Sequence, residues 1–243
     1  MTSRNVTVEH SVSTWRQPSP PAVSAERSAL VAWMARRVTG LGPGRLLIGI
    51  DGLTASGKTS FGHELAEAVA RAGRPVLRAC LDDFKNPWRD RHRYDRESGE
   101  GYYRNAYDYA TARELLLDPC RSAGPAVCSL CSLDPLTQID HAAVTTPVAD
   151  DAVLIVDGVF AFRPELNAYW HHRIWLDVDD GLSVARGAAR DGGDGWAGSE
   201  AEALHRDRYL GAAHVYLREV RPLSLADVVI DNRDFAAPRV IVP

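Results

Sequence analysis

Residues Gly52–Thr59 read GLTASGKT, an unbroken match to the phosphate-binding loop pattern GxxxxGK[ST]. Gly52 and Gly57 lack a Cβ atom, so the backbone can turn tightly and point successive N–H groups at one anion. The ammonium of Lys58 can reach the β- and γ-phosphates of a nucleotide, and the hydroxyl of Thr59 can ligate Mg²⁺. The residues that we expect to hold a nucleoside triphosphate are Gly52, Ala55, Ser56, Gly57, Lys58, Thr59 and Ser60.

The flanks of this loop fit a strand before it and a helix after it. Leu46–Asp51 is a short apolar run, typical of a buried parallel strand. Apolar residues then recur at helical spacing from Phe61 to Ala72, and Gly73 can end the helix. The N-terminal dipole of such a helix adds positive potential at the phosphates. The motif therefore stands in the context that a nucleotide-binding loop requires.

Further apolar runs alternate with amphipathic segments along the chain. Strands are expected at residues 75–81, 153–156, 174–178 and 227–231, the last of these being the final strand. Helices are expected over residues 24–40, 108–118 and 199–220, and around Val184 and Ala188. Ser24 and Asp108 can act as N-caps, and Pro119 should end the second helix. This alternation predicts an α/β fold: a doubly wound parallel sheet with helices on both faces.

The remaining segments lack a regular pattern. Residues 1–24 are polar and fit a tail or loosely docked arm, which leaves residues 25–243 as one domain. Residues 85–108 are charged and aromatic, and a loop of this length in a compact domain is usually functional. Residues 126–147 predict a small irregular hairpin. The Gly- and Asp-rich stretch 190–198 predicts a mobile loop within a lid at about residues 186–200.

The bulk composition argues against several classes of protein. With 243 residues, 45% of them hydrophobic, the chain can bury one full core. A net charge of −4 and a pI near 6.1 argue against a nucleic-acid partner. No apolar run approaches the roughly 20 residues of a membrane-spanning helix. The N-terminus also lacks the pattern of a secretory signal, so we expect a cytoplasmic protein without membrane contact.

The cysteines give a weak signal. Cys80, Cys120, Cys128 and Cys131 are too few to crosslink a chain of this length into a disulfide scaffold. Cys128 and Cys131 form a CxxC pair, which could be redox-active or half of a zinc site. No second CxxC or HxxxH pair completes a metal cage, so reduced thiols are the expectation.

Several strand ends should meet at one edge of the predicted sheet. Ligands of such sheets lie outside the carboxyl ends of the strands, where Gly52, Asp82 and Asp157 all stand. Asp157 can hold Mg²⁺, and Asp82 or Asp83 can accept the proton of an attacking alcohol. Consecutive residues of an extended segment point to opposite sides, so only one of these two aspartates should face the phosphates. Arg186 and Arg190, which precede the glycines of the 190–198 stretch, could close over the phosphates as a lid.

These elements, in this order, resemble the uridine kinase branch of the P-loop small-molecule kinases, which includes phosphoribulokinase and bacterial pantothenate kinase. Besides GLTASGKT, the matching stretches are LDDF at Leu81–Phe84, VLIVDGVF at Val153–Phe160, RGAARD at Arg186–Asp191 and ADVVIDN at Ala226–Asn232. The resemblance implies an ATP- and Mg²⁺-dependent kinase. It further implies that Asp82 is the catalytic base, that Asp157 lies near Mg²⁺ and that Arg190 is a lid arginine.

The acceptor half departs from the resemblance. Uridine kinases carry an Asp-His-Pro-Asp-Ala-Phe-Asp-like segment whose first aspartate holds the ribose hydroxyls, whereas residues 102–108 here read YYRNAYD. We therefore expect a nucleoside or nucleoside-like acceptor, with uridine and cytidine themselves poor substrates. The expected acceptor-binding residues are Asp83, Arg93, Tyr103, Arg104 and Asp108.

Other functions stay open at this point. The acceptor could be another small alcohol, pantothenate-like or sugar-phosphate-like. The chain could also be a P-loop NTPase without an acceptor alcohol, or a non-catalytic nucleotide-binding regulator. The set of phosphate, metal and base residues is complete, and no separate partner-binding domain is visible, which favours an enzyme. A small-molecule acceptor is thus the expected partner, and whether the chain forms a homo-oligomer is left open.

Overall fold

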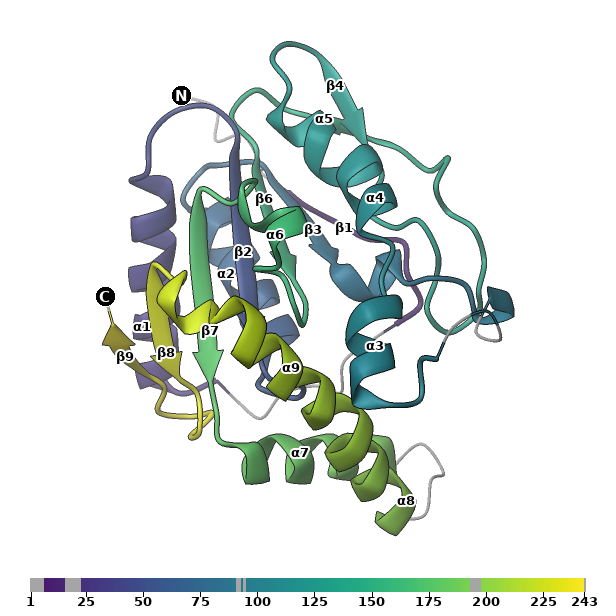
Figure 1. Cartoon of the computed structure of the whole chain (residues 1–243). Helices are drawn as coiled ribbons and strands as arrows, with labels where there is room; N and C mark the ends of the chain where they lie inside the picture. Colours follow the sequence, from purple (N-terminus) through teal and green to yellow (C-terminus); the bar gives the residue numbers. More distant parts are fainter. Residues whose placement is uncertain (1–6, 16–22, 91–92, 94, 193–197, 243) are drawn as a thin grey trace.

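The computed structural model describes residues 7–15, 23–90, 93, 95–192 and 198–242, which form a layered α/β structure (Figure 1). The strands are β1 (Val8–His10), β2 (Leu46–Gly52), β3 (Val76–Cys80), β4 (Ala126–Cys128), β5 (Thr146–Val148), β6 (Val153–Asp157), β7 (His172–Asp177), β8 (Val228–Asp231) and β9 (Arg239–Val242). Seven of these form one sheet in the order β1-β3-β6-β2-β7-β8-β9, parallel throughout except for β9. The other two, β4 and β5, pair as a small antiparallel hairpin, as predicted.

Helices cover both faces of the large sheet (Figure 1). They are α1 (Ala25–Thr39), α2 (Lys58–Arg71), α3 (Gly99–Asn105), α4 (Tyr109–Ala112), α5 (Asp118–Arg121), α6 (Pro164–Asn167), α7 (Asp180–Gly192), α8 (Gly198–Ala203) and α9 (Gly211–Val220). Two π-helical segments, Arg113–Leu117 and Leu204–Leu210, join α4 to α5 and α8 to α9. Short 3₁₀ turns lie at Leu81–Phe84, Trp88–Asp90 and Pro222–Ser224.

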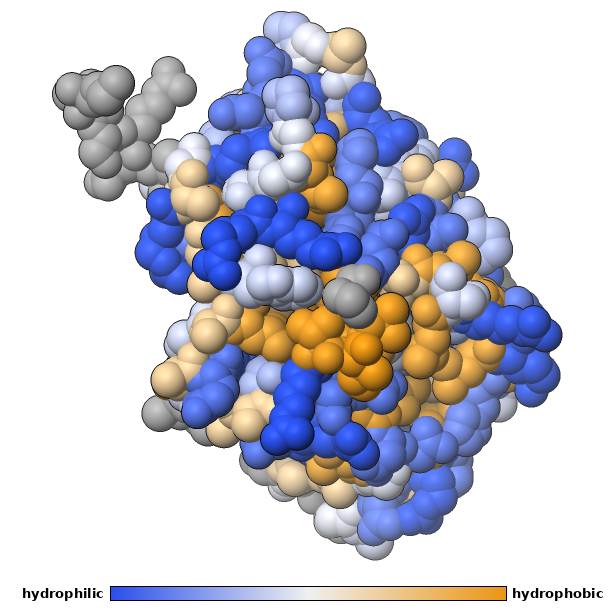
Figure 2. Space-filling model, turned by 90° about the vertical axis from the view of Figure 1, so that its left-hand side faces the viewer, coloured by the Kyte–Doolittle hydropathy of each residue, from blue (hydrophilic) through white to orange (hydrophobic). Residues whose placement is uncertain are grey.

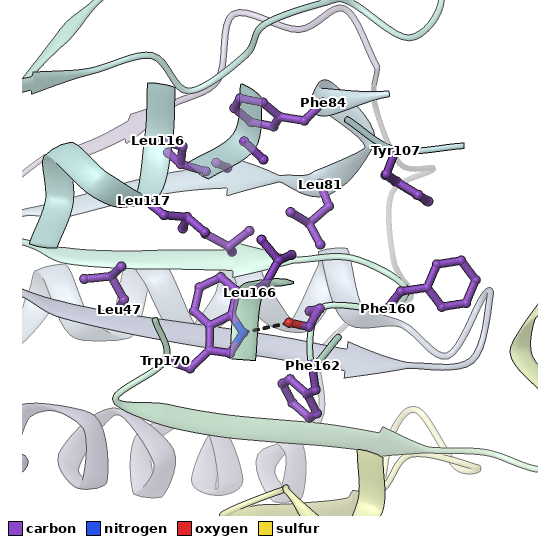
Figure 3. Packing of buried hydrophobic residues seen from close by; sticks show 14 of the residues in the cluster. Leu47, Leu81, Phe84, Tyr107, Leu116, Leu117, Phe160, Phe162, Leu166 and Trp170 are labelled. Carbon is purple, nitrogen blue, oxygen red and sulfur yellow. Dashed lines mark hydrogen bonds between the residues drawn. The ribbon is translucent and has the colours of Figure 1, made fainter. Parts of the chain in front are cut away.

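The strands bury alternate side chains in two cores. On β2, Leu46, Ile48 and Ile50 pack with α1 and α2, whereas Leu47 belongs to the core on the opposite face. In that second core the indole of Trp170 lies against β2 and donates from Nε1 to the carbonyl of Ala161 over 2.7 Å (Figure 3). Burial of both faces explains why the strands read as continuous apolar runs. The predicted doubly wound α/β fold is confirmed.

Two edge strands were not predicted. Val8–His10 lies within the polar N-terminal segment, yet it joins the sheet as β1, parallel to β3. β9 follows β8 and pairs with it antiparallel, so residues 227–231 are not the final strand. Most side chains of both strands are exposed, so neither needs the long apolar run that marks a central strand.

The helix that begins after Asp108 continues past Pro119, contrary to the prediction. Asp108 caps α4 as expected, accepting a backbone N–H at 3.0 Å. Pro119 has no N–H to donate to the carbonyl of Leu115, four residues earlier. That carbonyl instead accepts from the backbone N–H of Ser129 in the hairpin, at 2.8 Å. A tertiary hydrogen bond therefore replaces the lost helical one, and the helix runs on through a π-helical segment into α5.

Two other predicted loops, residues 85–108 and residues 190–198, differ from their predictions or lie partly outside the described residues. Residues 85–108 are not a loop throughout, because they contain α3, capped by Ser98. Of the predicted mobile loop at 190–198, residues 190–192 end α7 and residue 198 begins α8, while residues 193–197 lie outside the described residues. The long helix expected over residues 199–220 is present, with a π-helical segment in its middle.

The surface of the molecule exposes some large apolar side chains. Among the described residues, no helix is both long and apolar enough to cross a membrane. The side of the molecule that carries α1 and β9 is mostly polar around a central apolar patch (Figure 2). β9 itself exposes about half of the side chains of Ile241 and Val242.

Candidate active site

A cavity of about 590 Å³ lies where the carboxyl ends of β2, β3 and β6 meet. The strand register sets Asp157 of β6 beside Ile50 of β2 on one side and Cys80 of β3 on the other. The loop after β2, the turn after β3 and the end of β6 therefore converge, as expected for a parallel sheet. The predicted site residues that line the cavity are Ala55, Gly57, Lys58, Thr59, Asp82, Asp157 and Arg190.

The backbone of the phosphate-binding loop takes the conformation that its sequence predicts. Ala55 and Gly57 have positive φ angles of 56° and 92°. A Cβ on Gly57 would lie 2.7 Å from Nδ2 of Asn232, and one on Gly52 would lie 2.4 Å from the carbonyl oxygen of Leu176. Glycine is thus required at both positions. The resulting cradle opens into the cavity ahead of the N-terminus of α2 and fits the phosphates of a nucleotide.

Buried hydrogen bonds hold the phosphate-binding loop at the carbonyl of Ser56. Asn232 donates from Nδ2 to the carbonyl of Ser56 at 2.6 Å, and its Oδ1 accepts from Arg27 at 3.1 Å. The Arg27 side chain is fully buried, pairs with Glu64 at 2.8 Å and stacks on the ring of Phe235. The N-terminal helix, the helix after the loop and the segment after β8 are therefore tied to one loop carbonyl.

Lys58 is held at the base of the loop. Its Nζ donates to the carbonyls of Gly52 and Leu53 at 3.1 and 2.7 Å. Burial lowers the pKa of Lys58, and the nearby carboxylate of Asp51 opposes that shift. Asp51 itself is fully buried; burial raises its pKa to about 6, although the hydroxyl of Tyr216 donates to it at 2.6 Å. The ammonium is thus fixed where phosphate oxygens would lie against the loop.

Asp157 and Thr59 form the candidate metal site. The Thr59 hydroxyl donates to Oδ2 of Asp157 at 2.6 Å, so both oxygens lie close together at the cavity. The other oxygen of Asp157 accepts from Arg78 of β3 at 2.5 Å. A hydroxyl, one carboxylate and phosphate oxygens are the ligands that Mg²⁺ takes at nucleotide sites, so these residues fit it. The strand position of Arg78 gave no sign of this contact.

Asp82 is the member of the Asp82–Asp83 pair that lines the cavity. It lies on the 3₁₀ turn after β3, and its Oδ1 accepts from Lys85 at 2.9 Å and from the hydroxyl of Tyr107 at 2.8 Å. Partial burial favours the neutral acid, but the charge and hydrogen bond of Lys85 and the bond from Tyr107 outweigh it and lower the pKa of Asp82. Among the described residues, its Oδ2 has no hydrogen-bond partner. An ionised carboxylate oxygen thus faces the cavity.

Arg190 reaches the cavity from the end of α7. Its guanidinium donates to Asp191 at 2.6 Å, and Asp191 also accepts from His205 of the following helical segment at 2.8 Å. Burial works against ionisation of Asp191, but the bonds from His205 and Arg190 lower its pKa to about 2. Arg186, one turn earlier, donates to the carbonyls of Asn232 and Arg233 and does not line the cavity.

Three predicted phosphate-loop residues contribute from outside the cavity. Gly52 and Ser56 are buried beneath the loop, and Ser60 lies in the first turn of α2. They shape the loop and do not line the space that the phosphates would fill.

The structure does not bring the five predicted acceptor-binding residues to the cavity. Asp83 turns away toward Ser11, contrary to the idea of an extended segment, because Leu81–Phe84 is a 3₁₀ turn. Tyr103 is buried against Phe160 and Arg163. The remaining three are Arg93, which pairs with Asp90, Arg104, which pairs with Glu219, and Asp108, which caps α4.

Other residues line the space in front of Asp82. They are Trp15, Lys85, Trp88, Arg96, Glu97, Tyr102, Tyr107, Pro135, Leu136, Arg208 and Tyr209. Six of these eleven residues belong to the charged and aromatic segment 85–108. Without the position of α3, however, the composition of this segment could not tell Tyr102, which faces the cavity, from its buried neighbour Tyr103.

None of the four cysteines lines the cavity, although Cys80 ends β3 beside Asp157. All four are buried free thiols. Within the described part of the chain, no three His, Cys, Asp or Glu side chains gather as a metal cluster.

Comparison with known proteins supports the fold. No protein-family model matches the chain. Among solved structures, it is similar to a possible uridine kinase from Bacillus stearothermophilus, with a TM-score of 0.63, 22% identity, and coverage of 82% of this chain and 96% of that one. It is also similar to a proposed fructose transport system kinase from Silicibacter sp. TM1040, with a TM-score of 0.60, 22% identity, and coverage of 76% and 92%. The chain therefore has the fold of these two proteins, which is the fold that its motifs predicted.

Proposed function

We propose that this protein is a small-molecule kinase that transfers the γ-phosphoryl group of ATP to a hydroxyl of a nucleoside or nucleoside-like compound. The observation that carries the proposal is the position of Asp82. Its Oδ2 atom, which has no hydrogen-bond partner within the described part of the chain, belongs to a side chain that lines one cavity with Lys58, Thr59 and Asp157. Phosphoryl transfer to an alcohol requires a phosphate cradle and a carboxylate base in one space.

In this reaction the acceptor hydroxyl oxygen forms a bond to the γ-phosphorus while the bond to the β,γ-bridging oxygen breaks. Asp82 takes the hydroxyl proton, and Lys58 and Arg190 balance the charge on the transferring group. Mg²⁺, held by Thr59 and Asp157, would supply further charge neutralisation at the phosphates.

The ring-lined wall of the cavity supports a nucleoside-like acceptor. Trp88 is about half exposed and lines the same space as Tyr102 and Tyr209. Aromatic faces of this kind stack on planar groups such as nucleobases. Where uridine kinases have a ribose-gripping aspartate, however, Tyr102 stands.

A second candidate is an anionic alcohol, such as a pantothenate-like or sugar-phosphate-like compound. Among the described residues, Arg96 lines the cavity without an ion pair to a carboxylate and donates to the carbonyl of Asn86 at 3.0 Å. Its guanidinium can therefore still offer donors to a carboxylate or phosphate group.

An acceptor screen tests the proposal. Purified protein with MgATP is incubated with separate pools of nucleosides, sugar phosphates and pantothenate-like acids, and phosphorylated products are sought by mass spectrometry. A product that disappears in both Lys58→Ala and Asp82→Asn proteins supports a kinase, and the pool that yields it separates the two candidates. ADP formation at the same rate with and without every pool would instead indicate an NTPase.

A further inference from the structure

Residues 7–15, called here the docked segment, are fixed to the body of the protein by two buried carboxylates. After β1, the Ser11 hydroxyl donates to Asp83 at 2.7 Å. Thr14 then donates from both its backbone nitrogen and its hydroxyl to Oδ2 of Asp134, at 2.6 and 2.7 Å. The exposed fractions of Asp83 and Asp134 are 2% and 0%. The docked segment therefore has a defined place, although it belongs to the polar N-terminal arm.

The second anchor also shapes the cavity wall. The other oxygen of Asp134 accepts from the backbone N–H groups of Leu136 and Thr137, each at 2.8 Å. Burial opposes ionisation of Asp134, but these bonds and those from Thr14 outweigh it and lower its pKa. Because Leu136 lines the cavity, one ionised carboxylate holds the docked segment and the cavity wall in a fixed relation.

The docked segment ends at the cavity with Trp15. The guanidinium carbon of Arg190 lies 5.6 Å from the centroid of the Trp15 ring, within the range of a cation–π interaction. The same guanidinium also donates to Asp191, which His205 holds in turn. Arg190 thus has two restraints, Asp191 of α7 and Trp15 of the docked segment.

We propose that Trp15 is a positioning residue for Arg190, which it holds over the γ-phosphate of bound ATP. An arginine side chain has many rotamers, and fixing it on binding costs entropy. A ring that restrains the guanidinium before ATP arrives removes part of that cost. The docked segment is then a part of the active site. This inference rests on the proposed function, because it assumes that ATP occupies the phosphate loop.

The experiment compares a nucleotide with a γ-phosphate to one without it. Calorimetry measures the affinities of the full chain for Mg²⁺ with the β,γ-imido analogue of ATP and for Mg²⁺ with ADP. The quantity of interest is the affinity for the imido analogue divided by the affinity for ADP. Trp15→Ala should lower this ratio by about 3- to 10-fold, in keeping with the strength of a partly buried cation–π contact. Trp15→Phe should restore most of the ratio, because a benzene ring also attracts a guanidinium.

The matched control is Val12→Ala in the same segment, which removes a side chain that is 46% exposed and does not line the cavity. It should leave the ratio unchanged. Arg190→Met should lower the ratio at least as far as Trp15→Ala does. The double variant should add no further loss, since Trp15 acts only through Arg190. Thr14→Val, which weakens one anchor, should shift the ratio in the same direction.

Several outcomes would overturn the inference. These are an unchanged ratio in Trp15→Ala, equal weakening of both nucleotides, or losses that add in the double variant. Circular dichroism identifies a variant that fails to fold, and in that case Trp15→Phe and Thr14→Val decide the matter. If the ratio behaves as expected but no acceptor is found, the kinase proposal alone fails. If the wild-type chain binds neither nucleotide, both proposals fail.

Discussion

At the scale of single residues, neighbouring carboxyl groups acquire opposite properties from their surroundings. Asp82 and Asp83 are adjacent, yet the 3₁₀ turn sends one side chain to the cavity and the other into the protein. Asp82 has cationic and hydroxyl donors, which lower its pKa. Burial raises the pKa of Asp83 to about 7, although Ser11 donates to it. At neutral pH Asp82 is therefore ionised and lines the cavity, whereas Asp83 is about half protonated and does not line it.

The first prediction concerns the base. Asp82→Asn should reduce kcat by roughly 10²–10⁴-fold, since general-base catalysis contributes about that much, while ATP binding is largely kept. Asp83→Asn serves as the matched control and should have a much smaller effect on kcat. Steady-state kinetics with an acceptor from the screen measures both. Equal losses of kcat in the two variants, or a larger loss in Asp83→Asn, would show that Asp82 is not the base.

The second prediction concerns the phosphate loop. Lys58→Ala removes the fixed positive charge at the β- and γ-phosphates and should lower turnover roughly 10²-fold or more. The fold should survive, because the truncation deletes an ammonium that burial already disfavours. Circular dichroism checks folding, and product formation checks turnover. Near-normal phosphorylation by this variant would show that the phosphate loop is not needed for the reaction.

The third prediction concerns pH and stability. The ordinary pKa of 3.8 applies to Asp83 in the unfolded chain, and the folded value is about 7. The folded state therefore binds the extra proton between about pH 4 and pH 7, and stability contributed by this group is lost as pH rises through that window. Asp83→Asn has no proton to lose. As the pH rises from about 4 to about 7, the unfolding free energy of this variant, relative to that of the wild type, should therefore increase by up to a few kcal/mol. Denaturant titrations at several pH values would measure this difference. A constant difference would refute the raised pKa.

At the scale of elements, the ends of strands and helices depend on partners elsewhere in the chain. Pro119 would end an isolated helix, but Ser129 of the hairpin binds the carbonyl that the proline leaves free. The phosphate loop likewise depends on Asn232, which binds the carbonyl of Ser56. Local sequence rules name the residues that shape these elements, and tertiary hydrogen bonds decide where the elements stop.

The fourth prediction separates two effects at a loop glycine. Gly57→Ala introduces a Cβ at a φ of 92° and at 2.7 Å from Nδ2 of Asn232. Gly73→Ala has nearly the same φ, 93°, but no atom within 4 Å. The strained backbone should cost both variants about 1–3 kcal/mol of unfolding free energy. Only Gly57→Ala should also lose affinity for ATP, as calorimetry can measure, and similar affinities in the two variants would show that the contact with Asn232 is unimportant.

At the scale of the whole molecule, one arginine connects distant parts of the chain to the phosphate loop. Arg27 of α1 contacts Glu64 of α2 and Asn232 after β8, and its guanidinium stacks on Phe235. These partners lie up to 208 positions away in the sequence. The first helix, the loop helix and the C-terminal segment therefore form one support for the nucleotide site.

The fifth prediction tests this support. Arg27→Ala leaves the carboxylate of Glu64 and the Oδ1 atom of Asn232 without their partner, and should lower the unfolding free energy by about 3–5 kcal/mol. Affinity for ATP should fall as well. Arg36→Ala, at an exposed position of the same helix, is the control and should stay within about 0.5 kcal/mol of wild type. Denaturant unfolding and calorimetry would measure both quantities, and an unaffected nucleotide affinity in Arg27→Ala would separate the network from the loop.

The sequence by itself determined the α/β fold and the phosphate loop with its glycines. The reason is that these features are local: a contiguous octapeptide shapes its own backbone, and continuous apolar runs mark strands that are buried on both faces. It also indicated Asp82, Asp157 and Arg190 as residues of one site, since the carboxyl ends of parallel strands meet.

Only the tertiary structure decided which other side chains line the cavity. The orientation of α3 places Tyr102 at the cavity and buries Tyr103. Trp15 also lines the cavity, because the neighbouring Thr14 binds Asp134, which lies 120 positions further along the chain. Arg78 and Asn232 support the site through contacts between distant strands and loops. Such placements follow from packing against partners far along the chain, for which neither periodicity nor a short motif provides a signal.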